Sequence, residues 1–292
     1  MNLLGKCEGE VWSGSRKQRA GSQEPEAGSQ KASLSSRSCG TGVFWTSRDN
    51  TLQIQAVNII HKLYDRLPAS LQGKLDYHLR PGLRQGIVGP LNGQAHRQRM
   101  FNEIVTALKP AAIIETGTFR GTTTQYMHLQ SGAPVWTTEV SPKYFAFAQC
   151  MLSKHRDVKV ALSDSRAFLK KLSVDPAVPK QNVFFYLDAH WQDDLPLRDE
   201  VQIIMKSWKQ VAIMVDDFKV EDDPGYTYDD YGEGKCLELS YIGRFEDYGL
   251  QAFFPSVPSS QETSLKRGSV VLMDRAATEM AGNVPSLRKF QG

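Results

Sequence analysis

The sequence predicts an α/β fold of three layers, in which helices cover both faces of a doubly wound, mostly parallel sheet. Three observations lead to this prediction. Five short apolar runs between residues 111 and 218 alternate with helix-like segments. Glycine or proline interrupts many of the connections between them. Two further apolar runs, residues 251–256 and 267–274, follow without a helix between them, which favours an antiparallel strand pair at the C-terminal end of the sheet.

The order of these elements indicates right-handed strand–helix–strand crossovers. Strands are expected at AAIIET, VWTTEV, VKVALSDS, NVFFYLDAH and VAIMVDDF, with helices at TTTQYMHLQ, PKYFAFAQCMLSKH, RAFLKKL and LPLRDEVQIIMKSW between them. Pro142 stands at a first helical position, where its missing N–H costs nothing. Helices are also expected over residues 52–67, 96–109 and 237–249.

Composition divides the chain into four parts. Residues 1–49 are rich in Ser, Gly, Gln and charge and lack periodic apolar positions, so they are predicted to form a disordered low-complexity tail. Residues 50–110 are expected to form a helical prefix and cofactor lid, 111–275 the α/β core, and 276–292 a C-terminal tail.

Charge and composition exclude several classes of partner. The formal net charge of +3 is too small to indicate nucleic acid or an anionic membrane. The four cysteines are widely spaced, with no metal-finger pattern. No apolar run approaches the roughly 20 residues of a membrane helix. A cytoplasmic protein without nucleic-acid or membrane partners is expected, and a homo-oligomer stays open.

Each of the five central strands ends in an acidic residue. Because the carboxyl ends of parallel strands form one edge of the sheet, where ligands bind, these acids should converge although they are dispersed in sequence. The residues are Glu115, Glu139, Asp164, Asp188 and the pair Asp216–Asp217.

The turn after the first strand, ETGTFRG, carries Gly117 and Gly121, which let the backbone approach a ligand closely. Its spacing departs from the GxGxxG of dinucleotide sites, and Glu115 would repel a pyrophosphate. A cofactor with a positively charged amino group and sulfonium would interact favourably with that carboxylate. Glu139 suits a ribose diol, and Asp164 with Ser165 could bond an adenine edge. Solvated strand ends are the alternative for these acids.

The ordered set of ETGTFRG, VWTTEV, LSDS and YLDAH resembles the class I S-adenosylmethionine-dependent methyltransferases. The resemblance covers roughly residues 97–274 and implies a Rossmann-like methyltransferase core. One departure is Phe119, where the usual ExGxGxG motif has its central glycine. By this resemblance the methyl donor would be bound by Glu115, Gly117, Thr118, Phe119, Gly121, Glu139, Asp164, Ser165 and Asp188.

The acids after the fourth and fifth strands favour a divalent cation, because uncompensated carboxylates so close together repel one another. Hard oxygen ligands point to Mg²⁺ or Ca²⁺, although His190 leaves other metals open. The arrangement is similar to metal-dependent O-methyltransferases of the catechol and macrolide-sugar type, and this resemblance implies Asp188, Asp216 and Asp217 as ligands. His190 is expected to act with Asp188 in catalysis as the general base; a role in metal binding or substrate positioning and a purely structural role are the alternatives.

These resemblances imply Mg²⁺-assisted methyl transfer from S-adenosylmethionine to a hydroxyl of a small sugar-like or polyketide-like molecule. Loop 221–234 is a candidate acceptor lid, Trp191 a pocket wall, and Arg97 and Arg99 candidate partners of the cofactor carboxylate. Two alternatives stand beside this prediction: a non-catalytic protein that binds the methyl donor, and a metal-dependent hydroxylase. The hydroxylase is suggested by likeness to a bacterial group that includes cephalosporin hydroxylases, but no two-His facial triad is evident.

Overall fold

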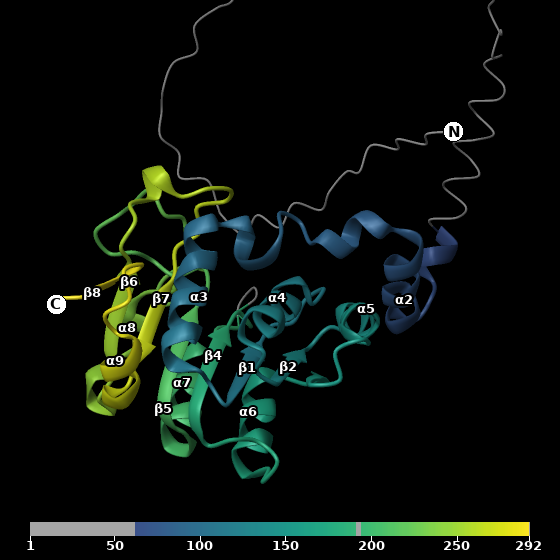
Figure 1. The fold of residues 1–292 in the computed structure, drawn as a ribbon. Helices are drawn as coiled ribbons and strands as arrows, with labels where there is room; N and C mark the ends of the chain where they lie inside the picture. Colours follow the sequence, from purple (N-terminus) through teal and green to yellow (C-terminus); the bar gives the residue numbers. More distant parts are fainter. Residues whose placement is uncertain (1–61, 191–193, 292) are drawn as a thin grey trace, which may run out of the picture. The chain divides into compact units, whose positions relative to one another are not determined.

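The computed structural model describes residues 62–190 and 194–291 (Figure 1). The predicted tail 1–49, most of the predicted helix 52–67 and Trp191 lie outside these residues. Among the described residues, 68–291 belong to one compact unit, and 62–67 belong to a separate one. None of the helices in the described part has the length and apolar character that crossing a bilayer requires.

One eight-stranded sheet organises the unit, in the order β3-β2-β1-β4-β5-β7-β6-β8. Strands β1 to β5 run parallel, whereas β7 is antiparallel to both β5 and β6, and β8 is antiparallel to β6. This arrangement confirms the predicted doubly wound, Rossmann-like fold. The strands are β1 Ala112–Thr116, β2 Val135–Glu139, β3 Val158–Leu162, β4 Gln181–Leu187, β5 Lys209–Val215, β6 Gln251–Pro255, β7 Val270–Met273 and β8 Leu287–Lys289.

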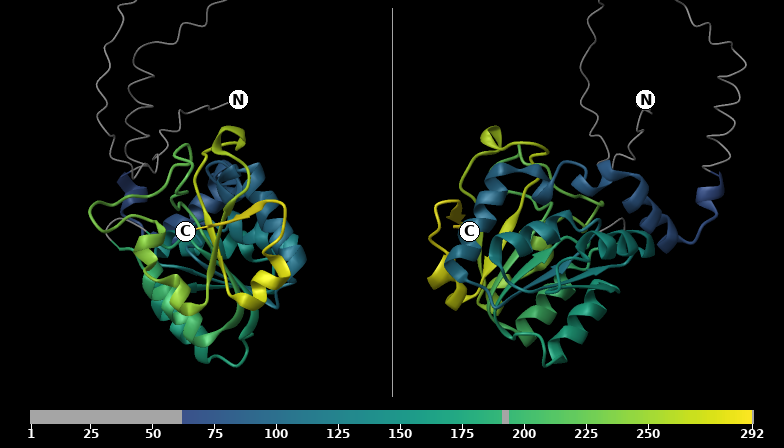
Figure 2. Two further views of the ribbon diagram at one scale, coloured as in Figure 1. Left: turned by 90° about the vertical axis from the view of Figure 1, so that its left-hand side faces the viewer. Right: turned by 45° about the vertical axis from the view of Figure 1, so that its right-hand side comes forward.

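Helices cover both faces of the sheet (Figures 1 and 2). Side chains on β4 alternate between two apolar clusters: Phe185 packs with the cluster that includes α6, α7 and α8, and Phe184 with the one that includes α3, α4 and α9. The α-helices within residues 68–291 are α2 Ala69–Leu79, α3 Ala95–Leu108, α4 Thr122–Ser131, α5 Pro142–Leu152, α6 Ser165–Val174, α7 Leu197–Ser207, α8 Leu239–Ile242 and α9 Arg275–Ala281.

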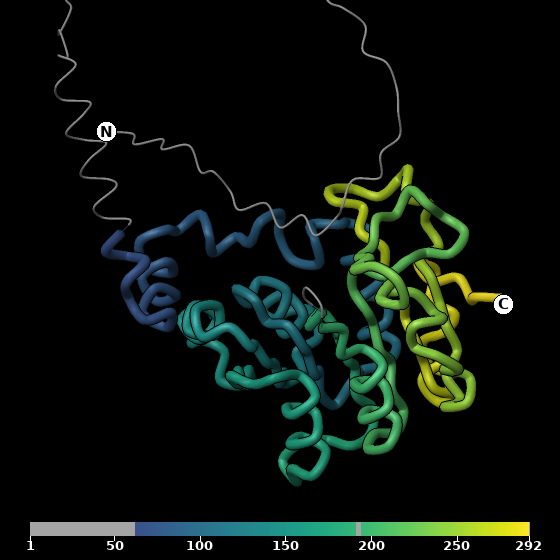
Figure 3. Tube along the Cα trace, turned by 180° about the vertical axis from the view of Figure 1, so that it is seen from behind, coloured from purple at the N-terminus to yellow at the C-terminus, as the bar shows by residue number. Residues whose placement is uncertain are grey.

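The structure differs from the sequence prediction at three places. Helix α2, which packs against α5, lies within the predicted helical prefix 50–110, between the two helices that were expected there (Figure 3). The predicted helix 237–249 is broken into α8 and a 3-10 turn, Phe245–Tyr248, because Gly243 between them adopts φ +87°. The predicted C-terminal tail 276–292 instead supplies most of α9 and all of β8. Strand β8 pairs with β6 along the edge opposite β7.

The strand order reverses between β1 and β4, since β2 and β3 extend from β1 in one direction and β5 extends from β4 in the other. At such a switch point the loops after the two central strands diverge to opposite faces and leave room for a ligand. The strand ends that carry Glu115, Asp188 and Asp216 therefore meet where a ligand site is expected.

Candidate functional site

The turn after β1 lies directly against the end of β4. Gly117 has φ +90°, and a Cβ at this position would lie 2.2 Å from the carbonyl oxygen of Asp188. The N–H groups of Gly117 and Thr118 both donate to the carbonyl of Thr138, at 3.0 Å. Glycine is required here by backbone conformation and by space. The turn and the Asp188 strand end are therefore fixed against each other.

Phe119 occupies the position where the methyltransferase motif has a glycine, and its φ of +48° lies in the left-handed region that glycine favours. Contacts with Glu139 and Tyr144 help to hold it there. Its N–H donates to Glu139 Oε2 at 2.7 Å, and its ring packs on Tyr144 with the centroids 4.5 Å apart. The Glu139 carboxylate, predicted to accept from a ribose, also accepts from the N–H of Ser141 at 2.8 Å. Burial raises the pKa of Glu139.

Glu115 is fully buried at the end of β1. Its Oε2 accepts hydrogen bonds from the hydroxyls of Thr124 and Thr137, while its Oε1 has no partner among the described residues. Burial raises the pKa of Glu115 to about 7. A buried carboxylate oxygen without a donor fits the amino group of the expected methyl donor, because an ammonium would satisfy the oxygen and compensate its charge.

Asp164 and Ser165 lie at the start of α6. Asp164 is the N-cap of that helix, and its carboxylate accepts from the N–H groups of Arg166 and Ala167 and from the Arg166 guanidinium. The hydrogen bond from the Arg166 side chain is the largest of the contributions that lower the pKa of Asp164. Ser165 is buried beside the carboxylate of Glu200 on α7, whose pKa is raised to about 7 by burial. Glu200 was not predicted, because one acid in an amphipathic helix gives no signal in the sequence.

Asp188, His190 and Asp217 form a cluster of possible metal ligands. One ligand atom from each lies within 4.8 Å of the others. His190 Nε2 is 3.8 Å from Asp188 Oδ1 and 3.7 Å from Asp217 Oδ2. Burial and the carboxylates of Asp216 and Asp217 raise the pKa of Asp188. We call these three residues the DHD cluster.

Asp216, expected beside Asp188 and Asp217, has its carboxylate engaged elsewhere. It accepts from the Arg97 guanidinium, from the Tyr186 hydroxyl and from Asn92 Nδ2 at 3.1 Å. The side chains of Arg97 and Asp216 are only 1% and 3% exposed, so this is a buried ion pair. The neighbouring Asp217 adopts φ +52°. The structure thus brings two of the three predicted metal ligands together with His190, and it holds Asp216 with Arg97.

Asp229 and Arg267 complete the surroundings of the DHD cluster. Arg267 donates to the carboxylates of both Asp217 and Asp229. Asp229 Oδ2 lies 3.5 Å from His190 Nε2, and its other neighbours include the Tyr231 hydroxyl, which donates to it at 2.7 Å. Contacts of Asp217 with His190 and Arg267 hold its pKa below the ordinary value, against the effect of burial. Burial would lower the pKa of His190, but the carboxylates of Asp217 and Asp229 raise it.

The donor set of the DHD cluster fits a divalent cation. Two ligands on opposite sides of an octahedral ion at 2.0–2.1 Å stand about 4.2 Å apart, which is compatible with atoms that all lie within 4.8 Å. Two carboxylates with one imidazole suit Mn²⁺, Fe²⁺ or Zn²⁺ as well as Mg²⁺. Sequence reasoning missed Arg267, since an isolated arginine before the last strands carries no local signal.

Arg97 and Arg99 were expected at the cofactor carboxylate. The structure places Arg97 on Asp216 and on the carbonyls of Arg267 and Gly268, and both arginines line a cavity that none of the DHD residues lines. Within the predicted acceptor lid, Tyr226 is buried and donates to the carbonyl of Val257 at 2.9 Å.

Known proteins resemble the chain in structure. No protein-family model and no curated protein matches it. An O-methyltransferase from Bacillus cereus, solved in complex with SAH, is similar with a TM-score of 0.48 and 18% identity, over 75% of this chain and 97% of that chain. A putative O-methyltransferase from Klebsiella pneumoniae is similar with a TM-score of 0.47 and 17% identity, over 79% of this chain and 97% of that chain. TomG, an O-methyltransferase from Streptomyces achromogenes solved with SAM, is similar with a TM-score of 0.46 and 14% identity, over 72% of this chain and 90% of that chain. Strand order and register by themselves define the Rossmann-like fold of the chain.

Proposed function

We propose that this chain is an S-adenosylmethionine-dependent O-methyltransferase that binds a divalent cation at Asp188, His190 and Asp217. The observation that carries the proposal is the contact between the glycine turn and the end of β4. Gly117, in the turn expected to bind the methyl donor, lies against the backbone of Asp188, which belongs to the DHD cluster. A methyl donor on the turn and a hydroxyl at the cluster would be neighbours, as an in-line displacement requires.

The residues of the candidate site would have separate roles in binding the methyl donor and the cation. Glu115 would accept from the amino group of the donor, and the turn would give its backbone close access. When bound, the donor would supply an electrophilic methyl group, and the cation would lower the pKa of an acceptor hydroxyl so that its proton can pass to a solvent water. Asp188 and Asp217 would hold the cation, and Arg267 would fix the orientation of Asp217.

His190 is assigned here as the third ligand and not as the base predicted from the sequence. Its Nε2 stands within 3.8 Å of carboxylate oxygens from Asp188, Asp217 and Asp229, so it faces the cluster itself. The same nitrogen cannot bind a cation and accept the proton of a substrate. Replacement of His190 by alanine should therefore weaken Mn²⁺ binding, whereas loss of a base alone would leave cation affinity intact and change the pH–rate profile.

The decisive experiment combines cation binding with methyl transfer. Mn²⁺ affinity by electron paramagnetic resonance and S-adenosylmethionine affinity by calorimetry would be measured for the full chain and for Asp217→Asn. Transfer of a labelled methyl group would be assayed on a panel of sugar and polyketide-like alcohols. We expect Asp217→Asn to weaken Mn²⁺ by about tenfold or more and to abolish transfer, while affinity for the methyl donor stays within a factor of about three.

Asp230→Asn is the matched control, because Asp230 lies in the same loop as Asp229 and, among the described residues, its carboxylate accepts a local N–H, from Gly232. This variant should behave like the unmodified chain. Transfer that survives chelation and Asp217→Asn would contradict the cation proposal. Donor binding without transfer to any alcohol would favour a non-catalytic binding protein instead.

A further inference from the structure

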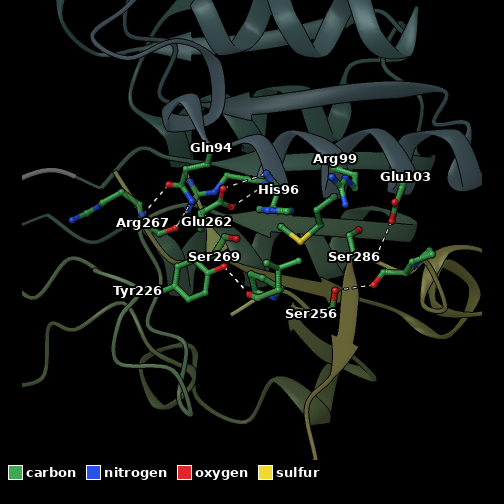
Figure 4. A pocket seen from close by; sticks show the side chains of 15 residues that line it. Gln94, His96, Arg99, Glu103, Tyr226, Ser256, Glu262, Arg267, Ser269 and Ser286 are labelled. Atoms are coloured by element: carbon green, nitrogen blue, oxygen red, sulfur yellow. Dashed lines mark hydrogen bonds between the residues drawn. The ribbon is translucent and has the colours of Figure 1, made fainter. Parts of the chain in front are cut away.

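A cavity of about 210 Å³ lies between the start of α3 and the β6–β7–β8 side of the sheet (Figure 4). His96, Arg97 and Arg99 line it from α3, and Ser269 and Ser286 line it from the segments before β7 and β8. It is separate from the DHD cluster, none of whose residues line it. We call it the α3 cavity.

Four polar side-chain atoms of residues that line the α3 cavity are buried and have no hydrogen-bond partner among the described residues. They are His96 Nδ1, Arg97 Nε, Ser269 Oγ and Ser286 Oγ. Ser269 is 1% exposed and Ser286 7%, and the Arg97 side chain is 1% exposed. Buried polar groups are normally paired, so four unpaired atoms around one cavity indicate that something else binds them.

The chemistry of these atoms selects the ligand. Arg97 Nε can only donate, and the two serine hydroxyls and the imidazole can each donate. Two carboxylates in the wall accept backbone N–H groups: Glu262 from His96 and Arg97 at 3.2 Å, and Glu103 from Ser286 at 2.9 Å. Arg97 Nε requires an acceptor, and an occupant that supplies acceptor oxygens would pair with all four atoms.

Part of the remaining wall is apolar, and its charged residues are Glu103, Glu262, Arg99 and Arg267. Met100, Pro255 and Val257 provide a hydrocarbon surface, and Arg99 is exposed beside them. The volume equals that of about seven waters, at about 30 Å³ each. A molecule of a few carbon atoms would fill it and match both surfaces.

We propose that the α3 cavity binds a small organic carboxylate. Its oxygens accept from Arg97 Nε and from the hydroxyls of Ser269 and Ser286, and its apolar part lies against Met100 and Val257. Arg97 also donates to Asp216, so the occupant contacts the guanidinium that holds the acid next to Asp217. The cavity is thereby joined to the strand ends of the candidate active site, but its occupation does not depend on methyl transfer.

Calorimetric titration of the full chain with butyrate and benzoate, against the neutral analogues butanol and benzamide, tests the proposal. We expect saturable binding of a carboxylate below about 10 mM, and binding of its neutral analogue at least about tenfold weaker, because hydrogen bonds from a guanidinium to an ionised group are the stronger kind. Ser269→Ala should weaken carboxylate binding about tenfold. It should leave the thermal stability of the unliganded chain equal or higher, since it removes an unpaired buried hydroxyl.

Ser256→Ala is the matched control within the same cavity. The Ser256 hydroxyl already donates to the carbonyl of Pro285 at 2.7 Å, so its loss should lower stability and leave carboxylate affinity within a factor of about two. Three results would overturn the proposal: no saturable binding of either acid, equal binding of the neutral analogues, or unchanged binding by Ser269→Ala. Because no methyl donor is present, these results are independent of the proposed methyl transfer.

Discussion

Replacing Glu115 by glutamine should remove a large part of the pH dependence of stability between pH 4.5 and 7. Glu115 is fully buried, and burial raises its pKa from 4.5 to about 7. The folded chain therefore holds a proton at Glu115 over a range in which the unfolded chain has released it. Since the folded state binds more protons there, stability must fall as pH rises through this window.

The size of the effect follows from the two pKa values. Each pH unit of difference corresponds to about 1.4 kcal/mol, so Glu115 contributes about 3 kcal/mol that is present below pH 4.5 and lost by pH 7. Glutamine cannot ionise, and it keeps the shape and an acceptor oxygen for Thr124 and Thr137. An unpaired amide would cost a constant amount at every pH, so the change with pH isolates the carboxylate.

Urea denaturation at pH 5, 6, 7 and 8 measures the difference. As the pH rises from 5 to 8, the free energy of unfolding should fall less for Glu115→Gln than for the unmodified chain. The two falls should differ by up to about 3 kcal/mol. Glu200→Gln should show a similar reduction, because burial also raises the pKa of Glu200 to about 7. A Glu115→Gln variant with the pH dependence of the unmodified chain would refute the reasoning, since it would mean that this carboxylate is solvated or paired in the folded protein.

Two further substitutions test the packing of the site by urea denaturation. Gly117→Ala should lower the free energy of unfolding by roughly 1–3 kcal/mol more than Gly132→Ala. Both glycines have positive φ, but only at Gly117 would a Cβ meet backbone, 2.2 Å from the Asp188 carbonyl oxygen. Equal losses for the two variants would contradict this contact. Arg97→Met should lower the free energy of unfolding by about 3–5 kcal/mol, because it leaves Asp216 buried without its cation. Adding Asp216→Asn should recover much of that loss. A loss below about 1 kcal/mol for Arg97→Met alone would contradict the buried pair.

The sequence predicts the sheet well because its signals are local. Apolar runs bounded by Gly or Pro mark the strands, and parallel pairing brings their acidic ends to one edge without knowledge of distant contacts. The positions of Glu115, Asp188 and Asp217 follow from that rule. The broken helix after Leu237 does not, because it depends on the conformation that Gly243 takes in the folded chain.

The direction of side chains at the site depends on contacts far along the chain. Asp216 and Asp217 are adjacent and chemically alike, so nothing local tells which one faces Asp188. The choice is made by Arg97, 119 residues before Asp216, and by Arg267, 50 residues after Asp217. The sequence shows these arginines only as isolated basic residues, and their partners appear only when α3 and the segment before β7 are in place.

The last strand has a practical consequence for anyone shortening this chain. β8 is only three residues long, Leu287–Lys289, yet it covers the outer hydrogen-bonding groups of β6 from Phe253 to Pro255. A version that stops at residue 275 would expose the apolar edge of β6, and that edge could pair with the same edge of another molecule. Such a truncation should yield soluble aggregates, even though every residue of the candidate active site would still be present.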